Sequence, residues 1–196
     1  TPNVAAEAIQ QKSQLIVSHH PILFRPIQRI TGADAEGRML LELIAARVNV
    51  YSPHTRYDSA VDGINQQLAQ LLELTATRVL RPKPRLDDEP PEDLSWGSGR
   101  MGSLPDEITL QQFNQRVKQC LDIEHVQFVG NEESIVRHVA IACGAAAEFL
   151  RDAKQLGCDV LLTGEARFHA CLEANSLDIS LVLPGHYATE RPAMEH

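Results

Sequence analysis

Histidines and carboxylates gather in four short polar segments of this chain, and each segment follows an apolar stretch. The first segment places two adjacent imidazoles, His19 and His20, ahead of a proline. The other three each place a histidine and a carboxylate four residues apart: His54 with Asp58, Glu165 with His169, and His186 with Glu190. On a helical turn this spacing puts both side chains on one face. Each pair could therefore hold a metal ion or act as a base and its orienting group.

A single pair of this kind is weak evidence, since histidines and acids meet at this spacing by chance and are usually exposed. Three pairs and a double histidine, all placed after apolar stretches, favour metal binding. Imidazoles and carboxylates without thiolates suit zinc, iron or manganese. Five or more such ligands exceed the three protein ligands of a typical catalytic zinc. We therefore expect two divalent metal ions that share a water activated as the nucleophile.

Helical patterns alternate along the chain with short aliphatic runs. The spacing of apolar residues predicts helices over 2–12, 34–47, 64–74, 109–121, 145–156 and 166–175. Strands are predicted over 15–17, 48–51, 78–80, 126–129, 139–142, 160–162 and 179–183, with 100–104 as a further strand candidate. This alternation indicates an α/β fold. The histidine segments then lie at the carboxyl ends of strands, where α/β proteins build their ligand sites.

The composition of the chain argues against several classes of function. The formal net charge of −8 and the absence of any Lys/Arg run argue against nucleic-acid binding. No apolar run approaches the roughly 18 residues of a membrane span, and no signal peptide is recognisable, so a membrane partner is not expected. The four cysteines lie far apart without a CxxC pair, which excludes a zinc ribbon and favours free thiols in a reducing compartment. A cytoplasmic location is therefore predicted.

The organisation of the chain is predicted from its loops and ends. A stretch rich in proline, glycine and acids separates a first α/β lobe, 1–81, from a second segment, 99–196, with 82–98 as the linker. The second segment ends in the GHYATE turn, which we expect to return to the metal site. The sequence begins at Thr1, in a helix-capping position before Pro2, and stops shortly after that turn. We expect it to be truncated at both ends.

Five segments resemble one known family, the GTP cyclohydrolase 1 type 2 homologues, also called Nif-three-like proteins. They are LIVSHHPILF (15–24), SPHTRYDSAVDGIN (52–65), GRMGSL (99–104), DVLLTGEARFHACLEA (159–174) and GHYATE (185–190). Their order and spacing agree through nearly the whole chain. The resemblance implies a two-lobed α/β fold with mixed sheets flanked by helices, assembled into a homohexameric ring whose metal sites face an inner cavity. Some members carry an inserted middle domain, for which the loop before Gly99 leaves no room.

The resemblance also implies roles for individual residues. The metal ligands would be His19, His20, Asp58, His186 and Glu190. Glu165 and His169 match positions near the metals and are candidates for proton transfer. His54 also matches a position near the metals and is a candidate for substrate contact. Apart from the resemblance, Arg25 and Arg56 are candidates for contact with anionic groups of the substrate. The glycine-rich turn of the family reads Cys-Gly-Ala-Ala at 143–146, so close packing is expected there instead of ligand binding.

Two functions follow from these residues. The first is a metal-dependent hydrolase that acts on a small nucleotide-like or phosphorylated substrate. The second is a metal-binding protein without catalysis, acting as a regulator or as a partner-binding ring. The ligands look identical in both, so an open coordination position beside a polar pocket would favour the enzyme. Full ligation by protein groups would favour the alternative.

Overall fold

The computed structural model describes residues 1–82 and 96–194 and divides into two compact units, Thr1–His54 and Thr55–His196. The division falls between His54 and Thr55, upstream of the linker predicted at 82–98. The reason is that the strands flanking that linker pair with each other, Pro82 with Gly97, within one sheet. Most of the predicted linker, 83–95, lies outside the described residues.

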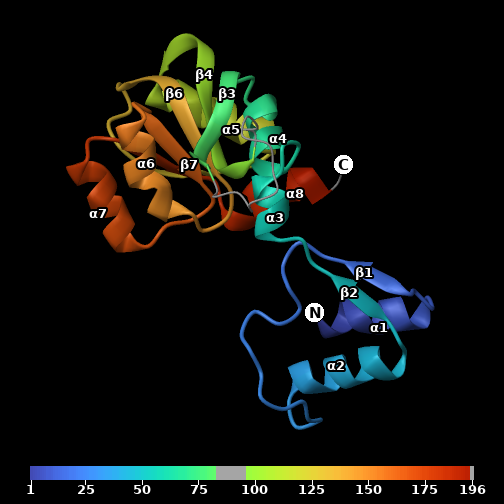
Figure 1. Ribbon diagram of the computed structural model, residues 1–196. Helices are drawn as coiled ribbons and strands as arrows, with labels where there is room; N and C mark the ends of the chain where they lie inside the picture. Colours follow the sequence, from blue (N-terminus) through green and yellow to red (C-terminus); the bar gives the residue numbers. More distant parts are fainter. Residues whose placement is uncertain (83–95, 195–196) are drawn as a thin grey trace. The chain divides into compact units, whose positions relative to one another are not determined.

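Unit 1 is a short parallel sheet with two helices (Figure 1). Its elements are α1 (Pro2–Gln10), β1 (Leu15–Val17), α2 (Ala35–Ala45) and β2 (Asn49–Tyr51). The strands pair in parallel, with Leu15 opposite Asn49 and Val17 opposite Tyr51. Helix α2 begins at a cap in which the Asp34 carboxylate accepts from the Gly37 amide at 2.7 Å.

The core of unit 1 is small and lies on one face of its sheet. Ile16 and Val50 pack with the helices against a cluster formed by Ala5, Met39 and Leu43. Side chains alternate across a strand, so the neighbouring residues point the other way. That opposite face is largely uncovered: Leu15, Val17 and Tyr51 are 52%, 66% and 58% exposed.

Unit 2 contains a mixed six-stranded sheet in the order β3-β4-β6-β7-β8-β5. The strands are β3 (Thr75–Pro82), β4 (Gly97–Thr109), β5 (Gln127–Val129), β6 (Ile135–Ala142), β7 (Val160–Thr163) and β8 (Ser180–Leu183). The helices are α3 (Thr55–Ser59), α4 (Ile64–Leu71), α5 (Leu110–Leu121), α6 (Leu150–Gln155), α7 (Phe168–Ser176) and α8 (His186–Met194). Strands β6, β7 and β8 run parallel, and β3, β4 and β5 pair in antiparallel fashion. The predicted α/β class with mixed sheets and flanking helices is confirmed.

Helices cover both faces of this sheet, with α6 and α7 on one side and α4, α5 and α8 on the other (Figure 1). Successive residues of β7 show the two-sided burial: Val160 and Leu162 join the cluster under α4 and α5, and Leu161 joins the cluster under α6. All three side chains are 0% exposed. Burial on both faces explains why the central strands read as continuous apolar runs.

Several elements differ from the sequence prediction. The polar segment at 54–58 falls mostly within helix α3, and the strands predicted over 78–80 and 100–104 extend to β3 and β4. The polar turn predicted at 185–190 lies almost wholly in helix α8, His186–Met194, which contains Pro192. The helix predicted over 145–156 begins with a 3-10 turn, Ala147–Phe149, and is α-helical from Leu150. Within 1–82 and 96–194, no helix has both the length and the apolar character that a membrane crossing requires.

Candidate metal centre

Three histidines meet at the carboxyl edge of the sheet of unit 1. His19 and His20 follow β1 and His54 follows β2, and because these strands are adjacent and parallel their last residues share one edge. The ring centroids of His19 and His20 lie 4.9 Å apart, and each lies 5.3 Å from that of His54. One ring nitrogen from each residue lies within 4.8 Å of the others. This spacing of nitrogen donors suits a transition-metal ion.

The backbone of this histidine cluster is held by two serines at the strand ends. The Ser18 hydroxyl donates to the His20 carbonyl at 2.9 Å, and the Ser52 hydroxyl donates to the same carbonyl at 3.1 Å. The Ser18 amide donates to the Tyr51 carbonyl at 3.0 Å, which extends the strand pairing by one bond. His54 has φ +43, a left-handed conformation that non-glycine residues seldom adopt. Such strain clusters at functional sites.

In unit 2, a single imidazole is clasped between two carboxylates. His186 Nε2 lies 2.9 Å from Glu190 Oε1, on the next turn of α8. His186 Nδ1 lies 3.0 Å from Glu165 Oε1, which comes from the turn after β7. The Glu190 side chain is only 10% exposed, whereas that of Glu165 is 60% exposed. A carboxylate on the second ring nitrogen is the arrangement that orients many metal-binding histidines.

The carboxylates change the acidity of the imidazole. Burial by itself lowers the pKa of His186, but the hydrogen bond to Glu165 and the charges of Glu190 and Glu165 outweigh it, so that the pKa is raised. The two carboxylates thus favour the protonated form of His186 more than an ordinary histidine's surroundings do. A metal ion at Nε2 would displace that proton and take over the neutralisation of Glu190.

Two glycines allow the turns of unit 2 to approach one another at this edge. A Cβ on Gly144, which has φ +69, would lie 2.9 Å from Glu190 Oε1 and 3.2 Å from His186 Nε2. A Cβ on Gly164 would lie 2.7 Å from both the Gly144 carbonyl oxygen and the His186 Cα. The space beside the His186–Glu190 pair therefore exists only because both positions lack side chains. The expectation of close packing at 143–146 agrees with this geometry.

Two buried threonines connect these turns. Thr189, on α8, accepts from the Gly144 amide at 3.1 Å and donates to the His186 carbonyl at 2.8 Å. Thr163, at the end of β7, donates to the Gly144 carbonyl at 3.1 Å. Both threonines are 0% exposed. The backbone around the His186–Glu190 pair is thereby fixed from three sides, by the ends of β6, β7 and β8.

Asp58 belongs to the same unit and is held against the end of β6. Its carboxylate Oδ1 accepts from the Cys143 thiol at 3.4 Å, and its backbone carbonyl accepts from Nδ2 of the Asn65 side chain at 2.9 Å. Burial is the largest cause that raises the pKa of the Cys143 thiol, and the charges of Asp58 and Glu190 raise it further. The thiol therefore stays protonated and can act as a donor.

The structure brings together some predicted residues and separates others. His186 and Glu190 pair as their spacing predicts, and His54 joins His19 and His20. Glu165 pairs with His186 instead of His169, because α7 begins only at Phe168 and the two residues do not share a helix. His169 is exposed with its ring 6.1 Å from that of Phe168, and the two predicted substrate contacts, Arg25 and Arg56, are exposed.

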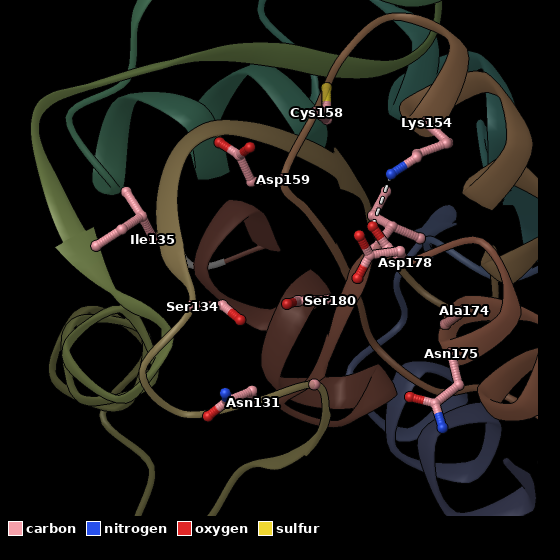
Figure 2. A pocket seen from close by; sticks show the side chains of 12 residues that line it. Asn131, Ser134, Ile135, Lys154, Cys158, Asp159, Ala174, Asn175, Asp178 and Ser180 are labelled. Atoms are coloured by element: carbon pink, nitrogen blue, oxygen red, sulfur yellow. Dashed lines mark hydrogen bonds between the residues drawn. The ribbon is translucent and has the colours of Figure 1, made fainter.

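A polar cavity of about 410 Å³ lies at the opposite ends of the parallel strands (Figure 2). Its polar groups already serve the fold. Lys154 Nζ donates to the Asp178 carbonyl at 2.7 Å, and Asp159 Oδ2 accepts from the backbone amides of Arg137 and His138 at 2.8 and 2.7 Å. The cavity is lined at the amino ends of β7 and β8, whereas His186 follows the carboxyl end of β8. It is therefore separate from the candidate metal centre.

Comparison with known proteins adds a family match across the chain. The family model described as Duf34/NIF3 (NGG1p interacting factor 3) matches residues 1–196. The GTP cyclohydrolase 1 type 2 homolog of Clostridium acetobutylicum is 30% identical over 194 residues, which cover 99% of this chain and 70% of that protein. The protein NIF3 homolog of Schizosaccharomyces pombe is 34% identical over 194 residues, covering 97% of this chain and 68% of that protein.

A solved structure agrees with the fold. The crystal structure of a Bacillus cereus protein related to NIF3 has a TM-score of 0.84 to this chain at 25% sequence identity. The alignment covers 96% of this chain and 76% of that one. The sequence similarity and the structural similarity therefore both relate this chain to NIF3 proteins.

Proposed function

Because this chain belongs to the Duf34/NIF3 family, we propose that it binds two divalent metal ions and acts as a metal-dependent hydrolase. The proposed ligands are His19, His20, Asp58, His186 and Glu190. The observation that carries the proposal is that metal-binding side chains stand at the carboxyl ends of parallel strands in both units, three imidazoles in unit 1 and an imidazole with carboxylates in unit 2. This is the edge at which α/β proteins bind their ligands.

The donors present fit such ions. In unit 1, three imidazoles offer nitrogens within 4.8 Å of one another, so His54 is a further candidate ligand. In unit 2, His186 Nε2 and Glu190 Oε1 converge over the bare Cα of Gly144. Nitrogen and oxygen donors of this kind suit zinc, iron or manganese, which are the ions proposed.

The residues beside the proposed ligands are proposed to orient a ligand or to carry protons. When bound, such ions lower the pKa of water and so supply a nucleophile at neutral pH. Glu165 is hydrogen-bonded to Nδ1 of His186, so that Nε2 is the ring nitrogen that would bind a metal ion. Being 60% exposed, the Glu165 carboxylate can also exchange a proton with a substrate or with solvent. His169, exposed at the start of α7, is proposed as a second proton carrier.

The proposed substrate is small and nucleotide-like or phosphorylated. Phe168 and Tyr187 follow β7 and β8, two adjacent parallel strands, and are 72% and 74% exposed. Exposed aromatic rings at this edge favour a ligand that carries a planar ring, because offset stacking adds to the area buried. Arg25 and Arg56 are proposed to contact anionic groups of the substrate. We also propose that the chain assembles into a homohexameric ring and that it is located in the cytoplasm. Measuring the mass of the protein in solution tests the hexamer directly.

Metal content tests the binding half of the proposal. The full chain, reconstituted separately with zinc, iron and manganese, should retain two ions per chain after desalting, measured by elemental analysis. The double variant His20→Ala/Glu190→Ala removes one donor from each unit and should lose most of the bound metal. Unchanged metal content in that variant would rule out the proposed ligands.

Turnover tests the catalytic half. The metal-reconstituted protein should hydrolyse at least one member of a panel of nucleotides and phosphoesters, and Asp58→Asn, which weakens a ligand without changing its size, should abolish this activity. Activity that persists in Asp58→Asn would locate the reaction elsewhere. Tight metal binding without turnover across the panel would support the non-catalytic, partner-binding alternative.

A further inference from the structure

Asn65 is a buried amide that joins two segments of unit 2. It lies in the first turn of α4 and is 2% exposed. Its Nδ2 donates to the Asp58 carbonyl at 2.9 Å, and its Oδ1 accepts from the Cys143 amide at 2.8 Å. A carbonyl can only accept and a backbone N–H can only donate, so the amide has a single favourable orientation. Asn65 thus fixes the backbone of α3 relative to the end of β6.

Cys143 makes the second connection between these segments. Its backbone is held by Asn65, and its thiol donates to Asp58 Oδ1 at 3.4 Å. The side chain is 8% exposed, so this contact is shielded from water. The next residue, Gly144, is the one whose missing Cβ leaves space beside Glu190 and His186. One short stretch of chain therefore contacts the Asp58 carboxylate and borders the His186–Glu190 pair.

We propose that Asn65 and Cys143 are positioning residues that orient the Asp58 carboxylate for metal binding, with the Cys143 thiol acting as a hydrogen-bond donor and not as a metal ligand. This inference rests on the proposed function of Asp58. The hydrogen bond from Asn65 holds the backbone of Asp58, and the bond from the Cys143 thiol to Oδ1 holds its carboxylate in the orientation in which it would bind a metal ion. Hydrogen-bonding partners of metal ligands commonly change metal affinity by about 10–100-fold.

The test is Zn²⁺ affinity, measured by competition with a chelator on the full chain, alongside thermal unfolding of the metal-free protein. Asn65→Leu deletes both hydrogen bonds at similar volume and should weaken Zn²⁺ binding by about 10–100-fold. Asn114→Leu deletes another buried amide of the same unit, 5% exposed on α5, and serves as the matched control. Among the described residues Asn114 Oδ1 has no hydrogen-bond partner, so Asn114→Leu should not lower the melting temperature and should leave Zn²⁺ affinity within about threefold. Equal affinity losses in the two variants would overturn the proposal.

The cysteine variants keep the test informative if Asn65→Leu fails to fold. Cys143→Ala removes the donor and should weaken Zn²⁺ binding by about tenfold, whereas Cys143→Ser keeps a donor and should restore affinity to within about threefold of the wild type. Cys158→Ala, at a buried thiol elsewhere in the unit, should have no effect on affinity. Equal binding by Cys143→Ala and the wild type would contradict the positioning role.

Cobalt spectroscopy separates positioning from ligation. The Co²⁺-loaded wild type should show ligand-field bands without a thiolate-to-cobalt charge-transfer band. If that band appears and is lost in Cys143→Ser, Cys143 is a ligand and the proposal is wrong. Asp58→Ala separates this inference from the proposed function: if Asp58→Ala binds Zn²⁺ like the wild type, both fail. If Asp58→Ala loses affinity while Asn65→Leu and Cys143→Ala keep it, only the positioning role fails.

Discussion

The two units present their donors at the same kind of sheet edge but hold them in different ways. In unit 1, three imidazoles stand at the end of a two-stranded sheet whose core cluster contains three buried residues, and two serines hold the turn through one carbonyl. In unit 2, one imidazole and its carboxylates stand at the end of a six-stranded sheet buried on both faces. There, buried threonines hold the turns through hydrogen bonds, and two glycines allow the turns to approach one another closely. The turns of unit 2 are therefore fixed by more buried contacts than the histidine turn of unit 1.

The largest expected difference concerns the two cores. Leu162→Ala, in a fully buried strand of unit 2, should lower the free energy of unfolding by about 4 kcal/mol, since surroundings closed on both sides cannot collapse into the cavity. Leu43→Ala in unit 1 should cost about 2–3 kcal/mol, because its thin core can relax. Hydrogen exchange of the metal-free protein should show the effect of Leu43→Ala confined to unit 1. If both variants lowered the free energy of unfolding equally and increased hydrogen exchange throughout the protein, the two cores would not differ as proposed.

A smaller effect is expected from glycines. Gly164→Ala in unit 2 places a Cβ 2.7 Å from two backbone atoms and should destabilise the protein by about 2–3 kcal/mol in denaturant unfolding. Gly32→Ala in unit 1 is the matched control, as its Cβ would meet nothing closer than Arg38 Cγ at 3.9 Å. That variant should be neutral within about 0.5 kcal/mol. A neutral Gly164→Ala would show that the turns of unit 2 are less tightly packed than described.

The smallest effect is a shift in pH dependence. The pKa of His186 is raised in the folded protein, so its contribution to stability is fully present below the unfolded pKa of about 6.5 and is lost as pH rises through the folded value. Glu165→Gln removes the main cause that raises it and should lower the His186 pKa, measured by NMR titration of the metal-free protein. The pH at which metal binding is half-maximal should fall with it, because less proton competition remains. An unchanged titration would mean that Glu165 does not control this imidazole.

The sequence predicts the fold class and the strand-end placement of the site because both depend on local pattern. Apolar runs mark the central strands, and the spacing from His186 to Glu190 matches one helical turn. What it does not predict depends on contacts between distant residues. Cys143 meets Asn65 across 78 positions, and Glu165 meets His186 across 21. The first could have been suspected only from a polar residue on the apolar face of α4, since Asn65 precedes the buried Leu68 and Ala69 by three and four positions.

The pairing of Pro82 with Gly97 identifies a place in the chain where an additional segment can be inserted. These two residues are register partners of β3 and β4, so the chain leaves the sheet and returns to it at neighbouring points. Partner residues of antiparallel strands lie about 5 Å apart at their Cα atoms. A segment inserted between them can therefore begin and end at neighbouring points of the sheet, which leaves the register of the two strands as it is. This hairpin is a natural entry point for grafted domains and reporter tags.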